Sequence, residues 1–150
     1  MSHAGFLRDH HDGPTEDVVG LVRALADAGE AAAELPLRDG VSLVQARIDT
    51  ALEGSSLAEH RTLLHYVARL ALAPRTMRAV HLAPLRADGY ADRELHDVAN
   101  VVCCFSYMNR LADGLGVTSD YPPGSWAEQL LGAERLAAHR AWATEGRPDG

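Results

Sequence analysis

Apolar residues between Leu95 and Leu115 recur at helical spacing and form two adjacent stripes. One stripe consists of Leu95, Val98, Val102 and Phe105, and the other of Val101, Met108, Ala112 and Leu115. Together they cover most of the circumference, which predicts a helix in the middle of a bundle or sandwiched between subunits. We expect it to begin at Asp92 or Arg93, with Asp92 as the cap. It should end near Gly114 or Gly116, because glycine adopts the left-handed conformation that terminates helices.

The same period predicts further helices on both sides of this segment. The first of these helices is capped by Thr15 and ends at residue 29 or 33. Others are predicted over residues 41–52, 56–73 and 125–143, and a short one begins at Pro84 and ends in a turn at residues 88–89. Capping boxes are predicted at Ser56–Glu59 and Ser125–Glu128, and a connection with an Asp-Gly turn at 35–40.

Alternation with a period of two is missing over any useful length, so the predicted fold class is all-α. We expect one helical domain over residues 15–144, a flexible segment at 1–14 and a frayed end at 145–150. The polar string Asp9–Asp12 contains two histidines, and we interpret it as a solvated tail rather than a metal site.

Composition narrows the class of function. The chain has 150 residues, of which 47% are hydrophobic and 5% aromatic, so a core of Ala, Leu and Val is expected. Its net charge is −7, and Lys and Arg form no block, which argues against nucleic-acid binding. Apolar runs fall short of the roughly 18 to 20 residues that span a bilayer, and the N-terminus lacks a signal-peptide pattern. These features predict a cytoplasmic protein without a membrane partner.

Two strings carry a family resemblance. They are Leu-Arg-Ala-Asp-Gly-Tyr-Ala-Asp-Arg-Glu-Leu at residues 85–95 and Tyr-Met-Asn-Arg-Leu-Ala-Asp-Gly-Leu-Gly-Val at residues 107–117. This region, roughly residues 55–117, resembles the C-terminal part of peroxidase-related proteins in the alkylhydroperoxidase D / carboxymuconolactone decarboxylase superfamily. The resemblance implies an alkylhydroperoxidase D-like helical bundle.

Active members of that superfamily carry a glutamate about three turns before a Cys-x-x-Cys pair, and a histidine after it. One cysteine thiolate attacks the peroxide, and the second cysteine resolves the product as a disulfide. The glutamate and the histidine move the proton. Residues upstream of Ser55 contain no cysteine. An overlay of the motif on the central helix places Glu94, Ser106, Asn109 and Asp113 at its positions. Neither Ser106 nor Asn109 is a thiol, so the overlay suggests a structural copy of the motif.

Cys103 and Cys104 are the two cysteines of the chain. Consecutive helical side chains point about 100° apart, and Cα atoms near 3.8 Å lie closer than the usual disulfide range. We therefore interpret both as small buried hydrophobes. If one thiol is reactive, Cys104 is the candidate.

Acid/base groups form the second set of candidates. Glu59, His65 and His96 would constitute an acid/base site if the fold brought them into one cleft. For His96, between Asp92 and Asn100 at one-turn spacing, a solvated or hydrogen-bonded helix face is favoured over a metal or proton-relay site. His65 is interpreted as an interior histidine with a hydrogen-bond partner. Neither a cofactor nor a metal is predicted.

Two functional hypotheses follow. The first is an alkylhydroperoxidase D-like protein without thiol peroxidase activity, serving as a scaffold or binding module. The alternative is an active peroxidase-related antioxidant enzyme, or an acid/base lyase acting on a small molecule through a non-standard site. Either protein is predicted to be a homo-oligomer, because a short chain with such an apolar central helix needs a partner chain.

Overall fold

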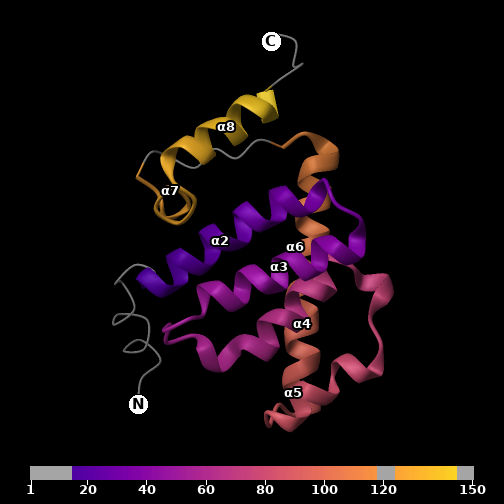
Figure 1. The fold of residues 1–150 in the computed structure, drawn as a ribbon. Coiled ribbons are helices and arrows are strands. Elements are labelled where there is room, and N and C mark those ends of the chain that lie inside the picture. Colours follow the sequence, from indigo (N-terminus) through magenta and orange to yellow (C-terminus); the bar gives the residue numbers. More distant parts are fainter. Residues whose placement is uncertain (1–14, 118–123, 145–150) are drawn as a thin grey trace, which may run out of the picture.

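Helices make up all the regular structure that a computed structural model describes, in residues 15–117 and 124–144 (Figure 1). The α-helices are α2 (Glu16–Ala33), α3 (Leu37–Ala51), α4 (Arg61–Leu72), α5 (Ala83–Ala87), α6 (Asp92–Leu115), α7 (Trp126–Leu131) and α8 (Ala133–Thr144), and the 3-10 turns are η1 (Ala58–His60), η2 (Pro74–Thr76) and η3 (Ala79–His81). Strands are absent from these ranges, which confirms the all-α class. The termini predicted to be flexible or frayed, 1–14 and 145–150, lie outside the described residues.

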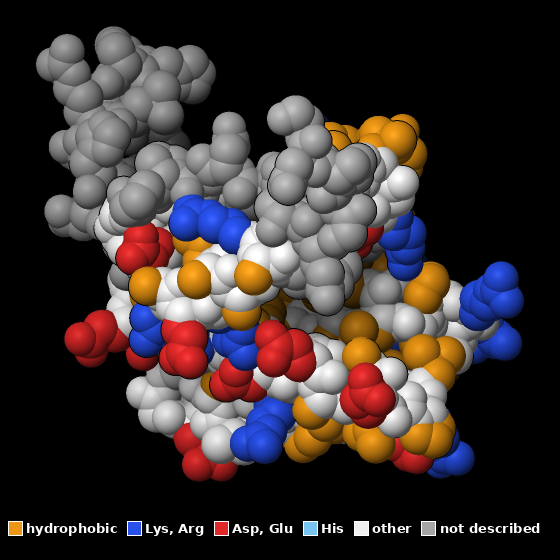
Figure 2. All heavy atoms as spheres, turned by 90° about the horizontal axis from the view of Figure 1, so that it is seen from above, with side chains coloured by type: hydrophobic (Ala, Val, Ile, Leu, Met, Phe, Trp, Pro, Cys, Tyr) orange, Lys and Arg blue, Asp and Glu red, His pale blue; other side chains and the backbone are white. Residues whose placement is uncertain are grey.

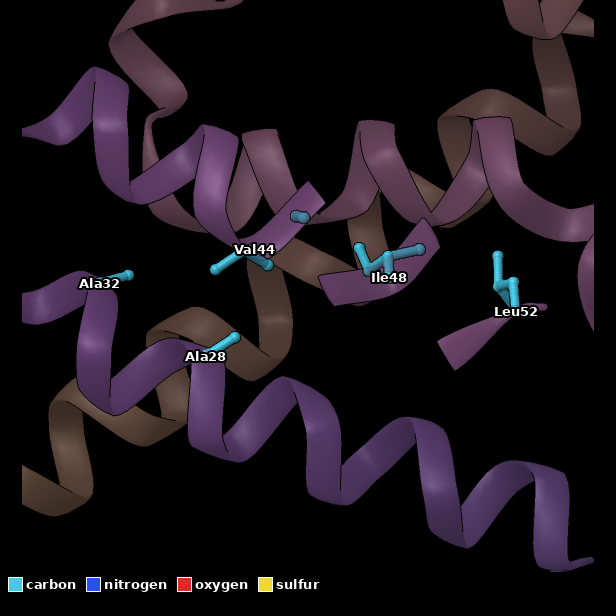
Figure 3. Close-up of a cluster of buried hydrophobic side chains, with 6 residues drawn as sticks. Ala28, Ala32, Val44, Ile48 and Leu52 are labelled. Atoms are coloured by element: carbon cyan, nitrogen blue, oxygen red, sulfur yellow. The ribbon is translucent and has the colours of Figure 1, made fainter. Parts of the chain in front are cut away.

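The first core lies where α2 and α3 pack as a hairpin, with α4 on the other side of α3. Small alanines on α2 share this core with aliphatic side chains of α3 and its C-cap, and Figure 3 shows Ala28 and Ala32 next to Val44, with Ile48 and Leu52 following along α3. Ala68 of α4 completes this buried cluster. Alanine keeps the two helix axes close, so a core almost free of aromatic residues still packs tightly.

The connection between α2 and α3 is shorter than predicted, and the Asp-Gly turn expected there is wrong. Pro36 is the N-cap of α3, and Asp39 lies in its first turn, where the helix dipole favours a carboxylate. Gly40 is buried within the helix, and a Cβ there would meet the Ala32 carbonyl oxygen at 3.0 Å. The glycine therefore permits close approach of two helices rather than a turn.

The capping box predicted at Ser56 and Glu59 is also wrong. The Ser56 backbone N–H donates to Asp17 Oδ2 at 2.9 Å, and its hydroxyl donates to the same oxygen. Residues 58–60 form the turn η1, and α4 begins only at Arg61. Ser56 thus joins the loop before α4 to the start of α2, where Thr15 caps the helix as predicted by accepting from Val18 N–H.

The second core lies between α4, α5 and α6. Its buried members are Tyr66, Leu85 and Leu95, surrounded by partly buried side chains that include Leu63, Val67, Leu70, Met77 and Val98. Pro84 lies in the first turn of α5, as predicted, where its missing N–H breaks no hydrogen bond. This core fixes the N-terminal half of α6 to the rest of the molecule.

The helix expected over 125–143 is divided in two at Gly132, which has φ +87°. Ser125 makes no side-chain cap, and Glu128 instead accepts from the Gly124 backbone N–H. The pair α7 and α8 lies along α2 in Figure 1. Arg135 of α8 reaches two carboxylates of α2, Asp27 and Glu30.

Helix α6 has the predicted limits, from Asp92 to Leu115, and Gly116 follows with φ +63°. Its N-cap is Ala91 rather than Asp92, and the Glu94 carboxylate accepts from the Ala91 N–H at 2.7 Å. The expectation that α6 lies in the middle of a bundle is wrong for the single chain. Only Leu95 is buried among its described residues, because α4 packs against one side of the helix and most of the second half is exposed.

Candidate functional site

An uncovered apolar surface runs along the C-terminal half of α6. Val101, Phe105, Met108 and Leu115, here called the α6 strip, are between 52% and 69% exposed. At about 100° per residue these four side chains fall within one narrow arc of the helix. Large apolar side chains that are contiguous and exposed are typical of an interaction surface.

The two cysteines lie on the same helix. Both are free thiols and both are exposed, so the interpretation of Cys103 and Cys104 as buried hydrophobes is wrong for this chain. The prediction rested on an α6 that is covered on nearly all sides, in the middle of a bundle or between subunits, and the single chain leaves this part of the helix exposed. Their consecutive positions on a continuous helix keep the side chains pointing apart, which prevents a disulfide between them.

A cavity of about 390 Å³ lies between the end of α4 and α6. Its walls are mostly apolar, with one cationic and three weakly polar side chains, and the lining consists of Leu70, Ala71, Pro74, Val102, Cys103, Ser106, Tyr107, Arg110 and Leu111. Its volume falls within the range of small-molecule sites, roughly 300 to 1,000 Å³. Cys103 lies in this lining, whereas Cys104, the cysteine favoured from sequence, does not.

Tyr66 of the second core lies near Cys103, one of the residues that line this cavity. Burial raises the pKa of the Tyr66 phenol, and the neighbouring Cys103 raises that pKa further. The phenol therefore remains protonated and neutral at neutral pH. A neutral hydroxyl close to a thiol provides a hydrogen-bond donor and not a charge.

His65 is joined to α3 rather than to the cavity. Its Nε2 atom lies 3.0 Å from Asp49 Oδ1, and Arg61 Nη1 lies 3.1 Å from the same oxygen. The Nε2 atom is shielded from solvent and makes no aligned hydrogen bond among the described residues, so the Asp49 contact is an ion pair when the imidazole is charged. Gln45 donates to the His65 carbonyl oxygen at 3.4 Å. The cluster joins α3 to α4.

Glu59 and His96 have local partners of their own. Glu59 Oε1 lies 3.7 Å from His60 Nε2 at the exposed start of α4. His96 Nδ1 lies 3.1 Å from Asn100 Nδ2, one turn along α6, while Asp92 pairs with Arg86. The described contacts therefore place Glu59, His65 and His96 in three separate local groups.

Charged side chains of both signs are interspersed on the face shown in Figure 2. Within the described residues, no group of three or more His, Cys, Asp or Glu side chains is arranged to hold a metal ion. The same part of the chain contains no helix that is both long enough and apolar enough to cross a membrane.

Comparisons of the chain with protein-family models, with curated proteins and with solved structures found no match.

Several residues of this geometry were missed in the sequence. Asp49 belongs to the His65 cluster, and Tyr107 and Arg110 line the cavity beside Cys103. The contact of Asp49 with α4 depends on how α3 and α4 pack, and no local pattern signals it. The spacing of Cys103, Tyr107 and Arg110 at i, i+4 and i+7 would have placed them on one face of α6.

Proposed function

We propose that this protein is a homo-oligomeric scaffold of the alkylhydroperoxidase D-like kind. In it, the α6 strip is buried against the strip of a second copy, and dithiol peroxidase activity is absent. The N-terminal half of α6 anchors the helix in its own chain, and the C-terminal half presents the strip to the partner.

The observation that carries this proposal is the exposure of Val101, Phe105, Met108 and Leu115. Complete burial of one such side chain stabilises a structure by roughly 1.5–3 kcal/mol, so four on each side make a strong contact. The strip contains no charged residue and therefore does not select a charged partner. A two-fold axis matches the strip with itself, which makes a second copy the natural occupant.

The arrangement of the sulfur atoms supports the absence of dithiol chemistry. A resolving thiol must reach the attacking sulfur, and Cys103 and Cys104 point about 100° apart on an intact helix. The positions that the family motif would assign to thiols hold Ser106 and Asn109. A peroxide cycle through an intramolecular disulfide is therefore geometrically unfavourable.

A charge in the strip tests the interface. Phe105→Glu places two carboxylates near the two-fold axis, and we expect the dissociation constant of the oligomer to rise about 100-fold or more. Val80→Glu is the matched control, because Val80 is equally exposed but lies outside α6. Both are measured by sedimentation velocity. Equal effects of the two variants, or no effect of Phe105→Glu, would refute the interface.

Peroxide consumption tests the second part of the proposal. We expect the wild-type protein and the Cys103→Ser/Cys104→Ser variant to consume hydroperoxide at the same background rate. Turnover that the double variant loses would show that the protein is an active peroxidase-related enzyme instead.

A further inference from the structure

We propose that the cavity between α4 and α6 binds an apolar monocarboxylate, such as a medium-chain or aryl carboxylic acid, with its carboxylate on Arg110. This site lies outside the α6 strip and goes beyond the proposed scaffold function. It does not depend on the oligomer.

The shape and lining of the cavity define the body of the ligand. Leu70, Ala71 and Pro74 form the α4 side, and Val102 and Leu111 form much of the α6 side. Such walls favour a hydrocarbon, because burying apolar surface on both partners removes it from water. The volume of about 390 Å³ falls within the range of small-molecule sites.

Arg110 defines the head group. It is the one formally charged side chain in the described lining, and its Nη1 donates to the Ser106 carbonyl oxygen at 3.3 Å. The described residues place no carboxylate in an ion pair with it. The remaining N–H groups of the guanidinium are therefore available to an anion, which the planar fork binds in a bidentate manner.

A carboxylate fits this head-group position better than a phosphate monoester. The carboxylate carries one negative charge, which a single guanidinium balances, whereas the monoester carries close to two. In a chain of net charge −7, the second charge would remain uncompensated. The Tyr107 side chain lines the same cavity and offers one further donor to the second oxygen.

The cavity stays open in the proposed oligomer. At about 100° per residue, Cys103 and Arg110 lie on the side of α6 roughly opposite Val101 and Met108. A second copy seated on the strip therefore leaves the cavity accessible. An experiment that refutes the ligand site would therefore leave the proposed interface untouched, and the reverse also holds.

The two adjacent thiols provide a matched pair of reporters. Cys103 lines the cavity and Cys104 does not, and each single serine variant leaves one thiol in the chain. The Cys104→Ser variant is treated with neutral dithiodipyridine, with octanoate or octanol present, and release of thiopyridone is followed. We expect octanoate to slow the reaction of Cys103 several-fold, and octanol to require about tenfold higher concentration for the same protection. In the Cys103→Ser variant, octanoate should leave the rate at Cys104 unchanged.

The role of the guanidinium is tested in the same background. Arg110→Gln should raise the octanoate concentration that protects Cys103 about tenfold and leave the protective concentration of octanol unchanged. Arg110→Lys should restore part of the advantage of octanoate over octanol. Arg93→Gln, at the other end of α6, should have no effect. Circular dichroism and molar mass confirm that each variant keeps its fold and assembly.

Three results would overturn the inference. They are absence of protection at Cys103, equal protection by octanoate and octanol, and equal protection of Cys103 and Cys104. The last would place the ligand along the exposed length of α6 rather than in the cavity.

Discussion

At the scale of single residues, stability depends on a few aliphatic side chains. Ile48, Leu52 and Leu85 are the largest fully buried side chains of the described chain. Leu85 lies on the short helix α5, in contact with the cluster around Tyr66 and Leu95. Each of these side chains belongs to a buried cluster to which more than one helix contributes.

Leu85→Ala should therefore destabilise the protein by about 2–5 kcal/mol, through lost transfer energy and the cavity it leaves. Val80→Ala, at a position that is 68% exposed, should change the free energy of unfolding by less than about 0.5 kcal/mol. Urea unfolding followed by circular dichroism gives both values. Similar values for the two variants would contradict the assigned core.

Asp17 produces a defined pH dependence. Its pKa lies below the ordinary value of 3.8, because the Ser56 hydroxyl and the Ser56 backbone N–H both donate to its carboxylate. The contribution of the ionised Asp17 carboxylate to the stability of the fold is therefore fully present above pH 3.8. It is lost as the pH falls through the lowered pKa that Asp17 has in the folded state. We expect the Asp17→Asn variant to be less stable than the wild-type protein at neutral pH. When the midpoint of unfolding is measured against pH, the midpoint of the variant should fall less steeply in the acid range. Glu53→Gln, an exposed control, should keep the wild-type acid limb.

Sequence reasoning at this scale was accurate where a contact is local. Thr15 accepts from Val18, three residues away, and His96 meets Asn100 one turn along, both as the spacing predicts. It failed where a partner is distant in sequence. Ser56 binds Asp17 of α2, which is 39 residues away in the sequence, instead of capping its own helix.

At the scale of elements, close helix packing explains most departures from the expected boundaries. The residues 35–40 contain Pro and Asp-Gly, which locally favour a turn. In the structure, α3 begins at Leu37, because Gly40 allows it to lie against Ala32 of α2. Helix–helix contact overrides the local turn signal.

Two glycine substitutions separate packing from propensity. Gly40→Ala introduces a Cβ at 3.0 Å from the Ala32 carbonyl oxygen, and we expect it to destabilise the protein by about 1 kcal/mol or more. Gly29→Ala meets nothing within 4 Å and should stabilise α2 by about 0.5–1 kcal/mol. Thermal unfolding compares the pair. Stabilisation by both would show that α2 and α3 do not approach as closely as described.

At the scale of the whole molecule, the sequence predicted the helical class and the limits of α6. It did not predict how α6 lies relative to the other helices and to solvent. Its apolar period covers most of the circumference, and that pattern cannot distinguish burial within a chain from burial between chains. Leu95 and Val98 contact the second core, whereas Phe105 and Leu115 contact solvent. The exposure of Cys103 and Cys104 follows from the same geometry.

A bundle that leaves an apolar side of its longest described helix exposed to water has not buried all of its large hydrophobic side chains. The first half of α6 packs on α4 and α5, and in its second half the side that carries the α6 strip is exposed. A partner copy on the α6 strip would remove these apolar side chains from water and support the free half of the helix. The ligand cavity on the other side of α6 would then lie at the margin of the assembly.

The molar mass of the wild-type protein at micromolar concentration, measured by sedimentation velocity, tests this account most directly. We predict a species of at least twice the chain mass of 16.1 kDa, which persists on dilution through the micromolar range. A single monodisperse species at 16.1 kDa would contradict it, since the α6 strip would then remain exposed to water in solution.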